Sequence, residues 1–313
     1  MLADYPSPMN RQLFYATVWL AMIFTAGAAD TNSATGSPPP SAVSINATNQ
    51  RTFQVRGVVM ELDPDGVTAR VKHEEIPGYM PAMTMPIEVK DTNELAGLAV
   101  GDSISFRLIV TEDDGWMDQV RKLDVAEKTG APTTGSFRFV RDVEPLNVGD
   151  LLPDYTFTNQ AGQPVHLEQY RGQALALTFI FTRCPFPTFC PLMSSNFEKA
   201  QNQLLATTNG PTNWQLLTLS IDPEYDTPAI LKGYAEARRY NPKHWSFAVG
   251  SLVDVTALAE QFGMYFWREG GTISHNLRTV VIGADGRIRK IIPENKWTAD
   301  ELVAEMIQAA KRD

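Results

Sequence analysis

Between residues 51 and 126, hydrophobic and polar positions alternate loosely in short runs separated by turn residues. The runs predict five strands, at residues 53–62, 67–73, 83–89, 104–110 and 116–123. The clusters Asp63-Pro64-Asp65-Gly66 and Asp113-Asp114-Gly115 are typical of tight turns between paired strands. Five short strands in one segment predict a small closed, OB-like barrel, because closure removes exposed sheet edges.

From residue 148 to 311 the pattern changes to strands that alternate with helices. An uninterrupted hydrophobic run at 174–182 predicts a buried strand, and an apolar stripe over 191–205 predicts a helix after it. Further strands are expected at 214–221 and 245–249, and a hairpin at 279–282 with 287–292. Further helices are expected to begin at Thr227 and Pro228 and to span 252–262. A last helix is expected after Thr298, which forms a capping box with Glu301. This order predicts a thioredoxin-like α/β domain.

Two segments without periodicity flank the barrel. Residues 30–50 contain three consecutive prolines and almost no large apolar side chains, and residues 127–147 contain KTGAPTTGS, so both are expected to be linkers.

Residues 1–29 have the pattern of an export signal. Residues 13–29 carry no charge, follow Arg11 and end in small residues. A retained membrane anchor is the main alternative, because a stretch of this length just spans a bilayer. A buried core helix is the third interpretation, which the absence of a polar face disfavours. We expect an exported protein of the periplasm, soluble or tethered through residues 13–29.

Composition narrows the classes of function. The chain has 313 residues and a net charge of −9, which argues against general affinity for nucleic acid or an anionic membrane. Two cysteines exclude a disulfide scaffold and a zinc site of four thiolates, and four histidines exclude a histidine-rich metal store.

His73 and three methionines form the first candidate site. Met80, Met83 and Met85 fall within six residues, and His73 lies seven residues before Met80. Met83 and Met85 are two apart on a predicted strand and therefore point to one face. Thioethers with an imidazole favour copper(I) or silver(I). Methionines that merely fill the barrel core are the alternative.

Cys184, Cys190 and His275 form the second candidate site. Both cysteines lie in the heptapeptide CPFPTFC, between a predicted strand and a predicted helix. We expect Cys190 near the helix N-terminus, where the helix dipole favours the thiolate. A small structural disulfide is the alternative for the pair. His275 lies in SHNLRTVVIGADG, and a histidine satisfied in the core or at the surface is the alternative for it.

The stretch HEEIPGYMPAMTM resembles the metal loop of CusF-like periplasmic copper-binding proteins, which are small five-stranded barrels. The resemblance implies copper(I) bound by His73, Met83 and Met85. Where well-known members have a tryptophan cap, this chain has Met80, which could supply a third sulfur.

Residues 148–311 resemble the Sco/SenC family, thioredoxin-like proteins of copper delivery and thiol redox chemistry, through FIFTRCP, SIDPEYDTP and SHNLRTVVIGADGRI. The resemblance implies copper(I) ligands at Cys184, Cys190 and His275. The family's usual spacing is C-x3-C, whereas this chain has C-x5-C. Asp222, in SIDPEYDTP, is expected either beside the site or as the cap of its own loop.

Together the resemblances imply a metallochaperone that binds one copper(I) per domain and delivers copper to a cytochrome c oxidase subunit. One alternative is a thiol–disulfide reductase in which Cys184 and Cys190 are catalytic. A periplasmic copper or silver resistance protein is the third possibility. The methionine set favours a copper protein over a pure reductase.

Overall fold

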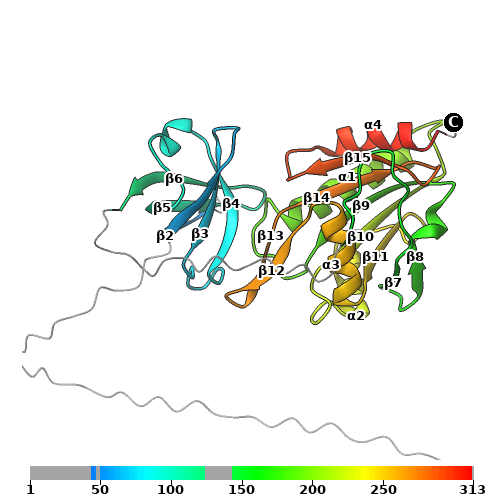
Figure 1. Ribbon diagram of the computed structural model, residues 1–313, viewed down its shortest axis with the longest axis horizontal. Helices are drawn as coiled ribbons and strands as arrows, with labels where there is room; N and C mark the ends of the chain where they lie inside the picture. Colours follow the sequence, from blue (N-terminus) through cyan, green and yellow to red (C-terminus); the bar gives the residue numbers. More distant parts are fainter. Residues whose placement is uncertain (1–43, 47–49, 124–142, 312–313) are drawn as a thin grey trace, which may run out of the picture. The chain divides into compact units, whose positions relative to one another are not determined.

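The N-terminal part of the described chain is a closed β-barrel, as the alternation predicts (Figure 1). The computed structural model describes residues 44–46, 50–123 and 143–311. The barrel strands are β2 (Gln50–Leu62), β3 (Thr68–His73), β4 (Met83–Val89), β5 (Ser103–Val110) and β6 (Gly115–Lys122). They follow the order β2-β3-β4-β6-β5, and β5 pairs back with β2, so each strand has two neighbours. A short strand, β1 (Ser44–Asn46), adds to β2 inside the predicted linker.

The C-terminal part is a seven-stranded sheet with four α-helices, and it has the predicted thioredoxin-like order. Its strands run β15-β14-β9-β10-β11-β7-β8, with β9, β10 and β11 parallel. The strands are β7 (Thr156–Asn159), β8 (Pro164–His166), β9 (Ala174–Ile180), β10 (Trp214–Ser220), β11 (Trp245–Val249), β14 (Arg278–Ile282) and β15 (Ile288–Pro293). The helices are α1 (Cys190–Ala206), α2 (Pro228–Ala237), α3 (Leu252–Gln261) and α4 (Ala299–Ala309).

The predicted helix starts are confirmed by side-chain caps. Thr227 accepts a hydrogen bond from the backbone N–H of Ile230 at the start of α2, with Pro228 as the first helical residue. Thr298 and Glu301 cap α4 reciprocally. Every residue of β9 is buried, which explains why its hydrophobic run does not alternate. The cysteines therefore follow the most buried strand of the sheet.

A hairpin that the sequence analysis did not predict positions His275. Strands β12 (Phe266–Glu269) and β13 (Thr272–His275) pair as a separate two-stranded sheet. Gly270 and Gly271 form the turn between them, both with positive φ, which glycine adopts without strain. His275 is thus the last residue of a strand and not part of a loop. The Gly-Gly pair between two short β-like runs was the available signal.

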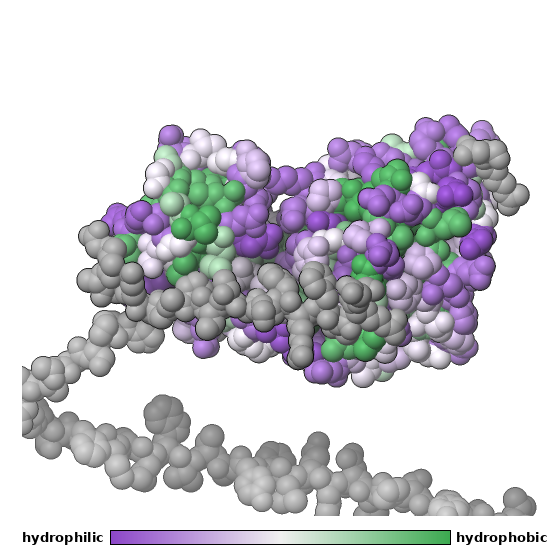
Figure 2. All heavy atoms as spheres, in the orientation of Figure 1, coloured by the Kyte–Doolittle hydropathy of each residue, from purple (hydrophilic) through white to green (hydrophobic). Residues whose placement is uncertain are grey.

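The described residues of the barrel and the α/β domain belong to one compact unit. Their buried hydrophobic side chains form one continuous cluster. Hydrophilic residues cover much of the visible face of both domains, and hydrophobic ones appear in separate patches (Figure 2). No helix among the described residues is long and apolar enough to cross a membrane. The predicted signal or anchor, residues 1–29, lies outside the described residues, as does most of the linker at 127–147.

Candidate metal centres

The structure brings Cys184, Cys190 and His275 together, and we name this group the thiol site. The two sulfurs and one imidazole nitrogen all lie within 4.8 Å of one another. Cys184 lies in the loop after β9, Cys190 is the first residue of α1, and His275 ends β13. Both cysteines are free thiols. The three groups come from distant points of the sequence, and only folding places them around one common point.

The orientation of His275 leaves one ring nitrogen available. Its Nδ1 lies 2.8 Å from the carbonyl oxygen of Asn276, to which it donates. Its Nε2 is buried and has no hydrogen-bond partner among the described residues. The rings of Phe181 and Phe189 contact the imidazole edge-on and hold it in place. A buried imidazole nitrogen that lies beside two sulfurs and has no other partner among the described residues fits a soft metal ion.

The two cysteines differ in acidity. Burial alone would raise the pKa of Cys184, but the Cys190 thiol, the His275 imidazole and the backbone N–H of Cys190 together lower it to about 5. Burial and the neighbouring Cys184 raise the pKa of Cys190. The prediction that the helix N-terminus favours a Cys190 thiolate is therefore wrong, because burial and the neighbouring Cys184 outweigh the effect of the helix terminus on Cys190. Cys184 is therefore the more acidic of the two cysteines.

Two buried aspartates hold the strand ends that carry the thiol site. Asp226 accepts hydrogen bonds from the backbone and hydroxyl of Thr182 and from Ser220, 2.5 Å away. Asp222 is fully buried and accepts from Arg183 at 2.6 Å and from Arg268 at 2.9 Å.

Arg183 precedes Cys184, and Arg268 lies on the hairpin that ends at His275. Asp222 therefore links the cysteine loop to the histidine hairpin. The sequence left open whether Asp222 lies beside the site or caps its own loop. In the structure it lies beside the site and contacts the two segments that carry the ligands through two arginines. Sequence reasoning did not identify either arginine.

His73, Met83 and Met85 lie on neighbouring barrel strands, and we name this group the thioether site. His73 on β3 is directly opposite Met83 on β4, and Met85 is opposite Val71. Opposite residues of an antiparallel pair have Cβ atoms about 4.5–5.5 Å apart, which lets an imidazole and a thioether reach one ion. All three side chains are buried, with at most 3% exposed.

The histidine of the thioether site has the same arrangement as His275. Its Nδ1 lies 2.7 Å from the carbonyl oxygen of Glu74, and its Nε2 is buried without a hydrogen-bond partner among the described residues. Burial lowers the pKa of His73, partly offset by the Glu74 carbonyl and the Glu269 charge, so the ring is neutral at neutral pH. A neutral imidazole is the form that binds a metal. The donor set fits copper(I).

Met80 and Tyr79 lie in the loop between β3 and β4. Met80 is buried and forms an isolated β-bridge with Ile76, so the loop folds back on itself. The ring of Tyr79 contacts Phe53 and the guanidinium of Arg51, which disfavours it as a replacement for the missing aromatic cap. Met80 as a third sulfur ligand stays a prediction.

The two other histidines lie apart from both sites. His166 is exposed beside Asp154. His244 is half-buried, and its ring stacks on that of Trp214 with 4.1 Å between the ring centroids.

Comparison with known proteins finds a matching family model for each of the two domains. Residues 144–311, just over half of the chain, match the family model described as SCO1/SenC. The chain belongs to the SCO1/SenC family. Residues 52–123 match the model described as copper binding periplasmic protein CusF, which covers the barrel. The resemblances found in the sequence are confirmed at the level of family and fold.

Individual relatives match the SCO1/SenC part. The SCO1 protein homolog of Bacillus subtilis is 30% identical over 151 residues, which cover 47% of this chain and 75% of that protein. The human mitochondrial SCO1 homolog is 26% identical over 148 residues, covering 45% of this chain and 47% of that one. A solved SCO1/SenC family lipoprotein from Bacillus anthracis has 26% identity and a TM-score of 0.46, covering 53% of this chain and 98% of that chain.

Proposed function

We propose that this SCO1/SenC protein is an exported copper(I) metallochaperone that binds one ion at the thiol site and one at the thioether site. The observation that carries the proposal is the cluster of two sulfurs and one imidazole nitrogen within 4.8 Å of one another, in which Nε2 of His275 is buried and has no hydrogen-bond partner in the described part of the chain. Thiolate, thioether and imidazole donors select copper(I) over harder cations.

The role as a donor rests on the same site. Two thiolates and an imidazole bind copper(I) tightly once Cys190 has lost its proton, and they leave room for an incoming ligand, because a three-donor site has a low coordination number. Resemblance to the Sco/SenC family supports the binuclear copper centre of a cytochrome c oxidase subunit as recipient. The match to a periplasmic copper protein supports export.

Copper transfer to that recipient tests the proposal. Reduced, copper(I)-loaded protein is mixed with the metal-free copper domain of a cytochrome c oxidase subunit, the two are separated, and copper is measured in each. We expect copper in the recipient, and we expect its amount to fall strongly for His275→Ala, because the third ligand is lost. His166→Ala is the matched control and should behave as the parent. No transfer from the loaded parent would contradict the proposed function.

The asymmetry of the cysteines favours a thiol–disulfide reductase as a second candidate. The Cys184 thiolate would attack a substrate disulfide and form a mixed disulfide, releasing the first substrate thiolate. Cys190, after losing its proton, would attack Cys184 and release the second, so that two electrons pass from the dithiol to the substrate. The test is reduction of an oxidised oxidase copper domain by the copper-free dithiol. The Cys190→Ser variant lacks the second thiol, so accumulation of a mixed disulfide between Cys184 and the substrate would support the reductase.

A further inference from the structure

The barrel contacts the thiol site through the strand that carries its methionines. Strand β4 lies against β13. The backbone N–H of Thr84 lies 3.1 Å from a carboxylate oxygen of Glu269 and 3.1 Å from the hydroxyl oxygen of Ser274. Thr84 lies between Met83 and Met85, and Ser274 directly precedes His275. The contact therefore joins residues that are immediate neighbours of ligands from both sites.

The barrel also contacts the cysteine loop. The hydroxyl of Tyr79 donates to the carbonyl oxygen of Pro185, 3.2 Å away, and Pro185 follows Cys184. Phe186 is 1% exposed and packs on Gly115 of β6, where a Cβ atom would lie 2.6 Å from its ring. The loop between the cysteines is two residues longer than is usual in the family. In this chain that longer loop supplies the side chain that packs on the barrel.

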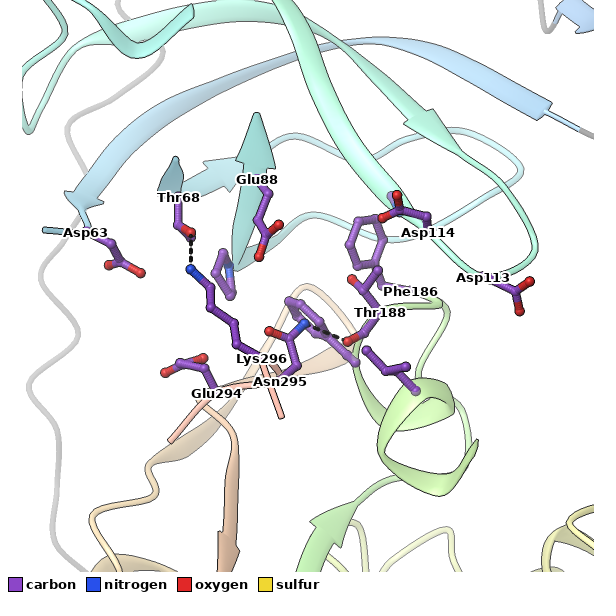
Figure 3. A pocket seen from close by; sticks show the side chains of 14 residues that line it. Asp63, Thr68, Glu88, Asp113, Asp114, Phe186, Thr188, Glu294, Asn295 and Lys296 are labelled. Carbon is purple, nitrogen blue, oxygen red and sulfur yellow. Dashed lines mark hydrogen bonds between the residues drawn. The ribbon is translucent and has the colours of Figure 1, made fainter. Parts of the chain in front are cut away.

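Charged groups hold the two domains together around these contacts. Lys72, beside His73, pairs with Glu269 at 2.9 Å. Lys296 forms an ion pair with Asp65 and lies 3.4 Å from the hydroxyl of Thr68. Figure 3 shows Lys296 extended from the α/β domain toward Thr68, at the edge of a cavity of about 280 Å³. Gly270 meets the carbonyl of Ala82 so closely that a side chain has no room there.

These contacts leave the ligands little access to water. The thioether ligands and His275 are each at most 3% exposed, Cys190 is fully buried, and Cys184 is half-buried. In both histidines Nε2 is buried and has no hydrogen-bond partner among the described residues. Most ligands of the two sites are thus shielded from solvent while the domains stay in contact.

We propose that copper(I) passes directly from the thioether site to the thiol site across this interface, without release to solvent. This inference rests on the proposed function. Copper keeps its +1 state throughout, exchanging two thioethers and an imidazole for two thiolates and an imidazole, and the proton of Cys190 passes to water. The direction follows from charge, because anionic thiolates bind copper(I) more strongly than neutral thioethers. The barrel is thus the loading site, and the thiol site receives its cargo.

The test starts with the full chain oxidised to a Cys184–Cys190 disulfide and loaded with one equivalent of copper(I). Excess bathocuproine disulfonate is added to trap any copper that reaches solution, and its coloured complex is followed. A phosphine reductant then opens the disulfide in one sample, while the other stays oxidised. We expect the reduced sample to retain at least tenfold more protein-bound copper, at a level that does not depend on chelator concentration.

Two interface variants and a control make the result specific. Gly115→Ala displaces Phe186, and Glu269→Gln removes the charge that pairs with Lys72. Both variants should lose most of the retained copper while binding copper at each site as the parent does. Gly210→Ala is the control, because it crowds only Thr207, outside the interface.

Equal capture of copper by the chelator in the reduced and oxidised parent would overturn direct transfer and leave the proposed function intact. Interface variants that retain as much copper as the parent would overturn it as well. A loaded, oxidised parent that holds no copper would instead contradict the thioether site of the proposed function, and direct transfer with it.

Discussion

Replacing Asp222 with asparagine removes the charge that joins the cysteine loop to the His275 hairpin. The carboxylate is fully buried and accepts from two arginines, at 2.6 Å and 2.9 Å. An asparagine of the same shape keeps a single acceptor oxygen, so one hydrogen bond is lost and the other loses its anionic partner. Hydrogen bonds to charged groups contribute about 1.5–3 kcal/mol each.

The side chains of Arg183 and Arg268 are 42% and 46% exposed, so water recovers part of what they lose. We therefore expect Asp222→Asn to lower the free energy of unfolding by about 2 kcal/mol, less than the sum of two such bonds. For a protein of this size the melting temperature should fall by about 4–8 °C. Binding of copper(I) must then also order the loosened hairpin. If this ordering takes about 1.4 kcal/mol of the binding free energy, the affinity of the thiol site for copper(I) falls about tenfold.

Thermal unfolding and copper(I) competition with a chelator measure the two effects. Glu224→Gln is the matched control, because Glu224 also binds Arg268, at 2.9 Å, but its side chain is 71% exposed. That exposed pair should contribute less than about 1 kcal/mol. The linking role of Asp222 is refuted if Asp222→Asn behaves like Glu224→Gln in both assays, or if stability falls while thiol-site affinity stays at the parent value.

Three further predictions follow from the sites and their interface. Met83→Leu combined with Met85→Leu should remove one bound copper. Each substitution should lower the free energy of unfolding by less than about 1.5 kcal/mol, because leucine and methionine have similar volumes. Metal analysis and thermal unfolding measure the two effects. Alkylation of Cys184 by iodoacetamide should rise with a midpoint near pH 5, following its lowered pKa, and mass spectrometry that finds Cys190 reacting first would contradict it. Burial raises the pKa of Glu269, but hydrogen bonds from Lys72, Ser274 and Thr84 bring it below its usual range. The stabilisation that the Glu269 carboxylate gives the interface is thus complete above the ordinary glutamate pKa of about 4.3, and it is lost as the pH falls through the lowered pKa of Glu269. Small-angle scattering should detect this loss as separation of the two domains.

The elements with strong periodicity could be predicted from sequence alone. Alternation and turn residues identified the barrel strands, and the buried run at β9 with the caps at Thr227 and Thr298 identified the α/β order. These features depend on local patterns, which the fold preserves. The ligand types could also be predicted, because soft donors cluster within short stretches.

The relation between the sites could not be predicted. The hairpin β12–β13 has few residues and a weak pattern, so the strand that ends at His275 was not predicted. The acidity of Cys184 depends on the Cys190 thiol and the His275 imidazole that folding brings beside it, and the sequence does not contain that geometry. The contacts of Tyr79 with Pro185 and of Thr84 with Ser274 join residues more than a hundred positions apart.

The copper(I) stoichiometry of the full chain, measured in reduced and oxidised protein, tests the account most directly. Thioethers form no disulfide, so oxidation should silence the thiol site alone. We predict two copper ions per reduced chain and one per oxidised chain, the latter lost when Met83 and Met85 are replaced by leucine. One ion in the reduced chain, or two retained after oxidation, would contradict the two-site account.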